Sequence, residues 1–246
     1  MKRAALLLGL ALLVSGAGSA EERRGPEAGG RRNSYANPSA VIAAELAFAQ
    51  AAQDRGQWTA FAESAAPDAV MFVPEMVWAQ GWLKNRANPP VAVKWQPHIV
   101  WSSCDGSLMV SHGAWQRPGA TGWFTTIWQR QRKGGYKWVL DHGDALKEPL
   151  LAPEMLSGLI ADCPARRARA DNAPPPPHPD ARPKKGALPP LDPAHRAGQS
   201  DDGSLRWEVT VDPSGARNLS VSWTKGGAQQ PVVIEQVDAP APRQAP

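Results

Sequence analysis

The sequence predicts an α+β protein in which helices come first and a meander of antiparallel strands follows. Three observations lead to this prediction. Apolar residues recur at helical spacing in the N-terminal half, they then alternate with polar residues at a period of about two, and a proline-rich stretch precedes a second alternating region. The composition, 42% hydrophobic and 20% charged, is that of a chain with a packed core.

Residues 1–20 predict a secretory signal peptide that is cleaved after Ala20. Lys2 and Arg3 precede an apolar run that is shorter than the ~20 residues of a permanent membrane span, and small residues follow it. An uncleaved N-terminal anchor is the disfavoured alternative. No later segment is apolar enough to span a membrane, so we expect a periplasmic or secreted protein without stable membrane insertion after cleavage.

Composition divides the remaining chain into five segments. A charged, glycine-rich leader precedes the region with nearly all the alternating apolar residues, and prolines among basic residues mark an extended tether beyond it. The segments are a flexible leader (21–38), a folded domain (39–163), a Pro-rich disordered linker (164–202), a three-stranded β meander (203–237) and a disordered tail (238–246).

The first part of the folded domain is predicted to be mainly helical. Ser39 is a suitable N-cap for a long helix over 40–54, which Gly56 ends. Shorter periodic runs and turn residues predict the other elements. These are a helix over 58–65, a strand over 69–73, a third helix over 77–86 and a short closing helix over 154–161.

Four antiparallel strands follow, where the apolar period changes to about two. Clusters of turn-forming residues join them, as in a meander. The strands span 92–102, 107–116, 122–132 and 136–142. The C-terminal meander shows the same alternation in three strands, and its single apolar face has to dock either on the main domain or on a partner.

Two blocks of sequence carry a family resemblance. They read AELAFAQAAQDRGQWTAFAESAAPDAVMFVP and GAWQRPGATGWFTTIWQRQRKGGYKWVLDHGD, and the likeness covers about residues 39–148. This region resembles the nuclear transport factor 2-like superfamily, most of all its SnoaL-like and ketosteroid-isomerase-like branch with its exported members. The resemblance implies a cone-shaped fold with a curved antiparallel sheet wrapped on N-terminal helices, an apolar pocket at the open end, and a homodimer through the outer sheet face.

Relatives with such a pocket isomerise or cyclise polycyclic ketones, or bind a ligand. The resemblance places a catalytic base where this chain has Val73, and an oxyanion-stabilising Tyr on the helix that here, over 40–54, contains none. Enolisation then lacks both its base and its donor. We therefore favour a small-molecule-binding or assembly module. The alternatives are an isomerase or cyclase acting on an apolar carbonyl compound, and an envelope scaffold that uses the C-terminal tail.

Strand parity predicts the residues of the pocket. If the strands hold register, five side chains point inward around a small apolar ligand. They are His112, Phe124, Trp128, Trp138 and His142. The two histidines are the candidate acid–base catalysts, and the competing interpretation is that each is satisfied by a hydrogen bond or lies at the wet end of its strand. Asp141 alternates away from the inward set.

Both cysteines of the chain, Cys104 and Cys163, lie in the predicted folded domain. In an oxidising compartment a single pair is expected to close, so we predict a disulfide between them. The sequence holds no HxH, CxxC or HExxH motif for a metal and no GxGxxG or GxxxxGK[ST] motif for a nucleotide, so we expect neither metal nor cofactor. Interspersed charges with a formal net charge of +4 disfavour a nucleic-acid partner.

Overall fold

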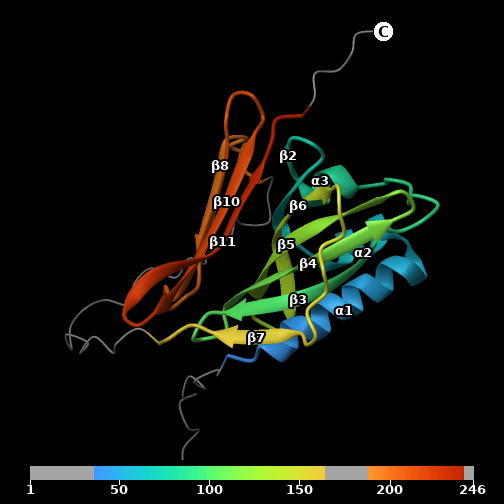
Figure 1. The fold of residues 1–246 in the computed structure, drawn as a ribbon. Helices are drawn as coiled ribbons and strands as arrows, with labels where there is room; N and C mark the ends of the chain where they lie inside the picture. The colour runs from blue at the N-terminus through green and yellow to red at the C-terminus, as the bar shows by residue number, and fades with distance from the viewer. Residues whose placement is uncertain (1–35, 164–187, 241–246) are drawn as a thin grey trace, which may run out of the picture. The chain divides into compact units, whose positions relative to one another are not determined.

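The computed structural model describes residues 36–163 and 188–240, so the predicted signal peptide and most of the leader and linker lie outside it. Figure 1 shows the elements in chain order. They are α1 (Pro38–Arg55), α2 (Gln57–Ser64), β1 (Ala65–Phe72), β2 (Met76–Trp78), α3 (Ala79–Leu83), β3 (Lys94–Ser102), β4 (Leu108–Arg117), β5 (Ala120–Arg130), β6 (Tyr136–Leu146), β7 (Ser157–Ile160), β8 (His195–Gln199), β9 (Leu205–Val211), β10 (Arg217–Lys225) and β11 (Ala228–Val237). Within these ranges no helix is long and apolar enough to cross a membrane.

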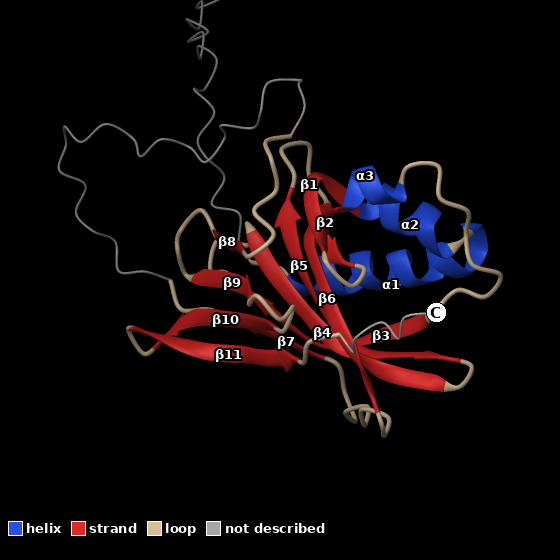
Figure 2. Ribbon diagram, turned by 90° about the horizontal axis from the view of Figure 1, so that it is seen from above, coloured by secondary structure: helices blue, strands red, loops and turns tan. Residues whose placement is uncertain are grey.

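The long helix α1 presents one buried stripe to the sheet. Its buried residues, Val41, Glu45, Phe48 and Ala52, are three or four positions apart, which places them on one side of a helix. Gly56 follows with φ of 99°, a backbone conformation that favours glycine, and α2 begins directly after it. Figure 2 shows all three helices on the same side of the sheet.

The main sheet has seven strands in the order β2-β1-β6-β5-β4-β3-β7. The neighbours from β6 to β3 are antiparallel, as the sequence predicts. Two pairs are parallel, β1 with β6 and β3 with β7, so the sheet is mixed. The prediction of an α+β protein with a helix-covered sheet is therefore confirmed, and the purely antiparallel sheet is corrected to a mixed one.

Two predicted helices differ from the structure. The third helix, expected over 77–86, is reduced to α3, because Met76–Trp78 pairs with β1 as the edge strand β2. The closing helix expected over 154–161 is wrong, since Ser157–Ile160 is strand β7 at the other edge of the sheet. Both stretches are short and apolar, and periodicity cannot separate a strand from a helical turn over such lengths.

The C-terminal region forms a separate sheet of four antiparallel strands in the order β11-β10-β9-β8. The prediction of a three-stranded meander is therefore corrected, because the sheet has a fourth strand. The additional strand, β8, lies at 195–199, inside the stretch predicted as linker. Its residues, HRAGQ, include none of the strand-favouring residues Val, Ile, Thr, Phe, Tyr and Trp, so no strand pattern marks it.

Two apolar cores lie on opposite faces of the main sheet. The helix-side core includes Phe48, Met109, Trp128 and Trp138. The second core combines residues of the main sheet with residues of the C-terminal sheet. It includes Leu108, Val110, Ile127 and Leu140 together with Leu205, Val209, Leu219, Val221 and Val233. The C-terminal strands thus dock on the chain's own sheet, over the face that the resemblance implied for a homodimer.

A β-bulge in β6 decides which side chains face which core. Ile127 pairs with Leu140 whereas Trp128 pairs with Trp138, so Val139 is an extra residue without an opposite partner. An extra residue reverses the alternation along a strand. As a result, Trp138 faces the helices while Leu140, two positions later, faces the C-terminal sheet.

Candidate functional site

A cavity of about 370 Å³ lies between the helices and the helix-side face of the main sheet. Most of its lining is aromatic, and the lining residues come from α1, α2, the loop before β3 and five strands of the sheet. The aromatic residues include Phe48, Trp58, Phe61, Trp95, Trp115 and Phe124. The polar residues are Gln57, Arg117, Thr126 and Asp141. Aromatic walls with few polar groups are typical of sites for small molecules.

Two larger depressions have a different character. One, of about 490 Å³, lies over β8–β10 and is lined mainly by polar side chains, including Arg206, Glu208 and Ser220. The other, of about 480 Å³, lies beside α2 and α3 and is bordered by Lys84 and Arg86. Neither combines an aromatic wall with a carboxyl group, so we take the aromatic cavity as the candidate site.

Among the described residues, Asp141 supplies the one carboxyl group that lines the aromatic cavity. It lies on β6, and the Thr126 hydroxyl on β5 donates a hydrogen bond to its Oδ2 at 3.1 Å. The pKa of Asp141 is raised to about 7. Burial is the main cause, the nearby charge of Glu45 is the second, and the hydrogen bond from Thr126 acts in the opposite direction. A carboxyl group of this kind exchanges a proton near neutral pH.

Alternation along an unbroken strand predicted that Asp141 points away from the pocket, and the structure corrects this prediction. The bulge at Val139 moves Asp141 to the helix side together with Trp138. An extra residue of this kind leaves no mark in the sequence. The one available signal was that Asp141 follows the apolar run Trp138 to Leu140, beside the aromatic stretch of β5.

Glu45 forms a second buried carboxyl group next to the cavity. It is 1% exposed. Trp95 Nε1 donates to its Oε1 at 2.8 Å, while Trp128 Nε1 and the Ser111 hydroxyl donate to its Oε2 at 2.9 and 2.5 Å. Burial raises the pKa of Glu45, and these three hydrogen bonds oppose that shift. Glu45 therefore connects α1 to three strands of the sheet and adds negative charge beside Asp141.

His112 and His142 lie on the opposite face, against the C-terminal sheet. His142 Nδ1 is 3.0 Å from Glu235 Oε2, and His112 Nδ1 is 3.2 Å from Glu235 Oε1. The Thr125 hydroxyl also donates to Glu235 Oε1, at 2.5 Å. Burial lowers the pKa of His142, so its neutral form is favoured even though Glu235 acts in the other direction.

The five predicted ligand-binding residues are therefore divided between the two faces. Phe124 lines the cavity. Trp128 and Trp138 are 1% and 0% exposed in the helix-side core, and the two histidines face Glu235. The single cavity that parity predicted is corrected for this reason, and a role of these residues in ligand binding or catalysis stays a prediction. Val73 packs beside the helix-side core.

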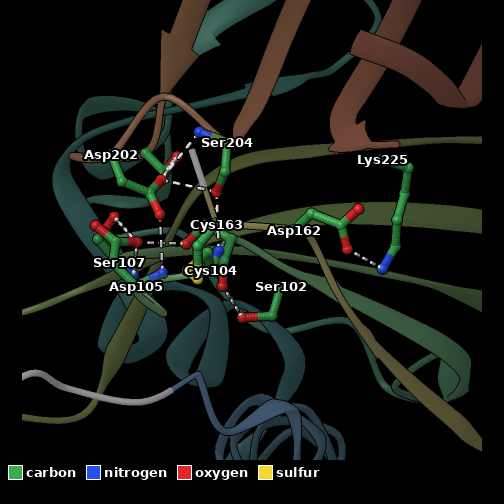
Figure 3. Close-up of a disulfide and its surroundings, with 11 residues drawn as sticks. Ser102, Cys104, Asp105, Ser107, Asp162, Cys163, Asp202, Ser204 and Lys225 are labelled. Carbon is green, nitrogen blue, oxygen red and sulfur yellow. Dashed lines mark hydrogen bonds and ion pairs between the residues drawn. A yellow bond between two sulfur atoms is a disulfide. The ribbon is translucent and has the colours of Figure 1, made fainter. Parts of the chain in front are cut away.

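The predicted disulfide is present between Cys104 and Cys163, whose Cα atoms are 5.0 Å apart (Figure 3). It joins the turn between β3 and β4 to the segment after β7. In that segment Asp162 pairs with Lys225 of β10 at 2.8 Å, as Figure 3 shows. Among the residues that the structure describes, no three His, Cys, Asp or Glu side chains are placed to hold a metal ion.

Comparisons with known proteins give structural neighbours with low sequence identity. One is described as a candidate ketosteroid isomerase from Parabacteroides distasonis, with 13% sequence identity and a TM-score of 0.37. The match covers 47% of this chain and 98% of that chain. A DUF3225-family protein of unknown function from Pectobacterium atrosepticum has 14% sequence identity and a TM-score of 0.37. The match covers 45% of this chain and 91% of that chain. An NTF-2-like protein of unknown function from Burkholderia xenovorans has 17% sequence identity and a TM-score of 0.32. The match covers 47% of this chain and 89% of that chain.

These neighbours are thus ketosteroid-isomerase-like and NTF-2-like proteins. No family model and no curated protein matches the chain. At these identities and TM-scores the neighbours transfer no residue role, substrate or activity to it.

Proposed function

We propose that this chain is a small-molecule-binding protein whose site is the aromatic cavity between the helices and the main sheet. The observation that carries the proposal is the combination of an aromatic wall with one carboxyl group, Asp141, in a cavity of about 370 Å³. Aromatic faces favour flat apolar molecules, and a single polar group fixes the orientation of such a ligand. Below its pKa of about 7, Asp141 donates a hydrogen bond to a carbonyl or hydroxyl group of the ligand.

Dye binding tests this site with a pair of matched variants. Trp115 lines the cavity, whereas Trp101 lies on the same sheet against the second core, and both are partly buried. We expect Trp115→Ala to weaken binding of anilinonaphthalene sulfonate, an anionic dye with an apolar ring system, roughly tenfold, because the Trp115 ring supplies buried apolar contact area. Trp101→Ala should leave the affinity unchanged. Equal effects of the two changes, or an unaffected Trp115→Ala variant, would contradict the proposal.

Export is the second part of the proposal. Its support is the n-region, apolar run and small residues at 1–20, together with the disulfide, which is typical of oxidising compartments. We expect N-terminal sequencing of the mature protein to begin at Glu21. Met1 on protein from the cytoplasmic fraction would refute export. Native mass spectrometry of the same mature protein would show whether a small molecule stays bound.

An isomerase or cyclase for an apolar carbonyl compound is the second candidate function, and Asp141 is the observation that favours it. The Asp141 carboxylate would take a proton from the carbon next to the carbonyl group, leaving an enolate, and after its own proton exchanges with solvent it would return one to that carbon in the reverse step. In deuterated water this exchange replaces the α-hydrogen of a cyclic ketone, which proton NMR detects. We expect exchange with the parent protein and none with Asp141→Asn. Exchange that persists in this variant would exclude Asp141 as the base.

A further inference from the structure

Two turns with nearly the same sequence occur in the two sheets. SCDGSL (103–108) joins β3 to β4, and SDDGSL (200–205) joins β8 to β9. In the first, Asp105 Oδ1 accepts hydrogen bonds from the Ser103 hydroxyl, at 2.7 Å, and from the amide and hydroxyl of Ser107, at 2.9 and 2.8 Å. In the second, Asp202 Oδ1 accepts the corresponding bonds at 2.7, 2.9 and 2.7 Å.

The two turns also contact each other reciprocally. Figure 3 shows Cys104 and Ser204, which form one of the two contacts. The amide of Cys104 donates to the Ser204 hydroxyl at 2.8 Å, and the amide of Asp201 donates to the Ser107 hydroxyl at 2.8 Å. Cys104 and Asp201 hold the same position in their turns, and so do Ser107 and Ser204. A contact in which i meets j while the equivalent of j meets the equivalent of i is typical of a two-fold axis.

Strand pairing extends this equivalence over four strands. The orders β6-β5-β4-β3 and β11-β10-β9-β8 correspond. After the turn, Leu108 pairs with Gln129 and the equivalent Leu205 pairs with Trp223, which makes β5 equivalent to β10. The fourth strand of each sheet contains the same bulge, an extra Val139 in β6 and an extra Val232 in β11.

The faces that pack together are composed of equivalent positions. In the main sheet they are Leu108, Val110, Ile127, Leu140 and His142, and in the C-terminal sheet they are Leu205, Trp207, Val221, Val233 and Glu235. His142 and Glu235 are equivalent to each other, and they are also in contact at 3.0 Å. A residue that touches its own equivalent lies on the axis of a two-fold arrangement.

We propose that β8–β11 is a structural repeat of β3–β6 and that it serves, within one chain, as the partner that this sheet face would otherwise bind in a second copy. The surface formed by β3–β6 fits a sheet with the same register and the same bulge. The C-terminal sheet supplies that sheet, and the residues described beside it, 188–240, contain no counterpart of the helices. The homodimer surface implied by the resemblance is thus used internally.

The pair on the axis explains why the internal partner is favoured over a second copy. Two copies that met through β3–β6 would bring His142 against His142, and no carboxylate would accept the protons of His112, His142 and Thr125. In the single chain Glu235 accepts from these groups. Replacing one member of an identical pair with an oppositely charged group is a common way to favour one partner over another.

Isotope mixing tests whether the docking is internal. Unlabelled and ¹⁵N-labelled full chains are unfolded together, refolded, and treated with a carbodiimide, which couples Lys225 to Asp162 across their 2.8 Å contact. Internal docking gives cross-linked peptides in which both parts carry the same isotope. Peptides with mixed isotopes would overturn the proposal, and so would the absence of the cross-link when the folded chain is treated. Lys225→Arg is the control that should abolish it.

Matched serine variants test the repeat itself. Ser107→Ala and Ser204→Ala each remove the same bonds, one to the aspartate of their own turn and one from the other turn. We expect both to lower the folding equilibrium constant by the same factor, roughly tenfold, because each hydroxyl makes two hydrogen bonds. Ser220→Ala, at an exposed position of β10, should leave it unchanged. A fall in only one of the two would overturn the equivalence of the turns.

Discussion

Replacing Asp141 with Asn is expected to stabilise the folded protein above pH 7 and to leave its stability below about pH 4 unchanged. The pKa of Asp141 is raised from 3.8 to about 7, so the folded state holds this proton more tightly than the unfolded state does. Stability linked to this proton is fully present below about pH 4 and is lost as the pH rises through about 7. Asn is neutral at every pH and keeps the shape of the side chain.

The magnitude follows from the size of the shift. About three pKa units, at about 1.4 kcal/mol each, give a ceiling of about 4 kcal/mol for the destabilisation by ionised Asp141. Asp141 keeps part of its surface open to the cavity, where water reduces the energy of the charge. We therefore expect Asp141→Asn to gain about 2 kcal/mol over the parent at pH 8.

Urea unfolding of parent and variant at pH 3.5, 5, 6, 7 and 8 measures this gain. The difference in unfolding free energy should be near zero at pH 3.5, grow between about pH 4 and pH 7 and level off above that, with equal urea dependence of the two proteins. Ser220→Ala, at an exposed position of β10, is the control and should show no such growth. A difference between Asp141→Asn and the parent that is the same at pH 3.5 and pH 8 would refute the reasoning.

Three further predictions concern the groups around the two cores. Glu235→Gln should lower the free energy of unfolding by about 2 kcal/mol at pH 7. Burial alone would raise the pKa of Glu235, but hydrogen bonds from three neighbours lower it overall. The contribution of Glu235 to the free energy of unfolding should therefore fade as the pH falls below about 4.5. Urea unfolding in which Glu235→Gln loses the same free energy at pH 7 and pH 3.5 would argue against this. Replacing Cys104 and Cys163 with Ala should cost about 4 kcal/mol in the same assay, from the loop entropy of a 59-residue separation, and an unchanged unfolding midpoint would contradict it. Glu45→Gln removes a negative charge beside Asp141, so carbon NMR of the Asp141 carboxyl group should show a lower pKa, and an unchanged value would exclude that coupling.

Periodicity in the sequence was sufficient to predict the long elements. The stripe of α1 and the alternation of β3–β6 are strong patterns, because each has one face buried in an apolar core. The short edge strands β2, β7 and β8 have no such pattern. Their backbone pairing with a neighbouring strand, and not their side chains, makes them strands, so their positions follow only from the assembled sheet.

The candidate site was predicted less well for two physical reasons. One is that β4 is buried on both faces, so His112 lies on the side of Val110 and faces the C-terminal sheet. The other is an extra residue in β6. Parity identified Phe124 as a cavity residue because β5 runs without an extra residue between Thr121 and Ile127. In β6 the bulge at Val139 reverses the alternation, so parity exchanged the positions of Asp141 and His142. Local sequence patterns also could not show that Glu235 accepts hydrogen bonds from the two histidines, since Glu235 lies 93 residues from His142 in the sequence.

The cavity and the internal repeat depend on the same two strands. On the helix side Thr126 donates to Asp141, and on the other side Thr125 and His142 both reach Glu235. Because neighbouring residues of a strand point to opposite faces, the C-terminal sheet holds the reverse side of the wall that carries the cavity's carboxyl group. The repeat has no counterpart of α1 and α2 among the described residues. In the proposed function, one sheet of the pair therefore forms the wall of the binding site, and the other covers the apolar reverse face of the strands that position Asp141.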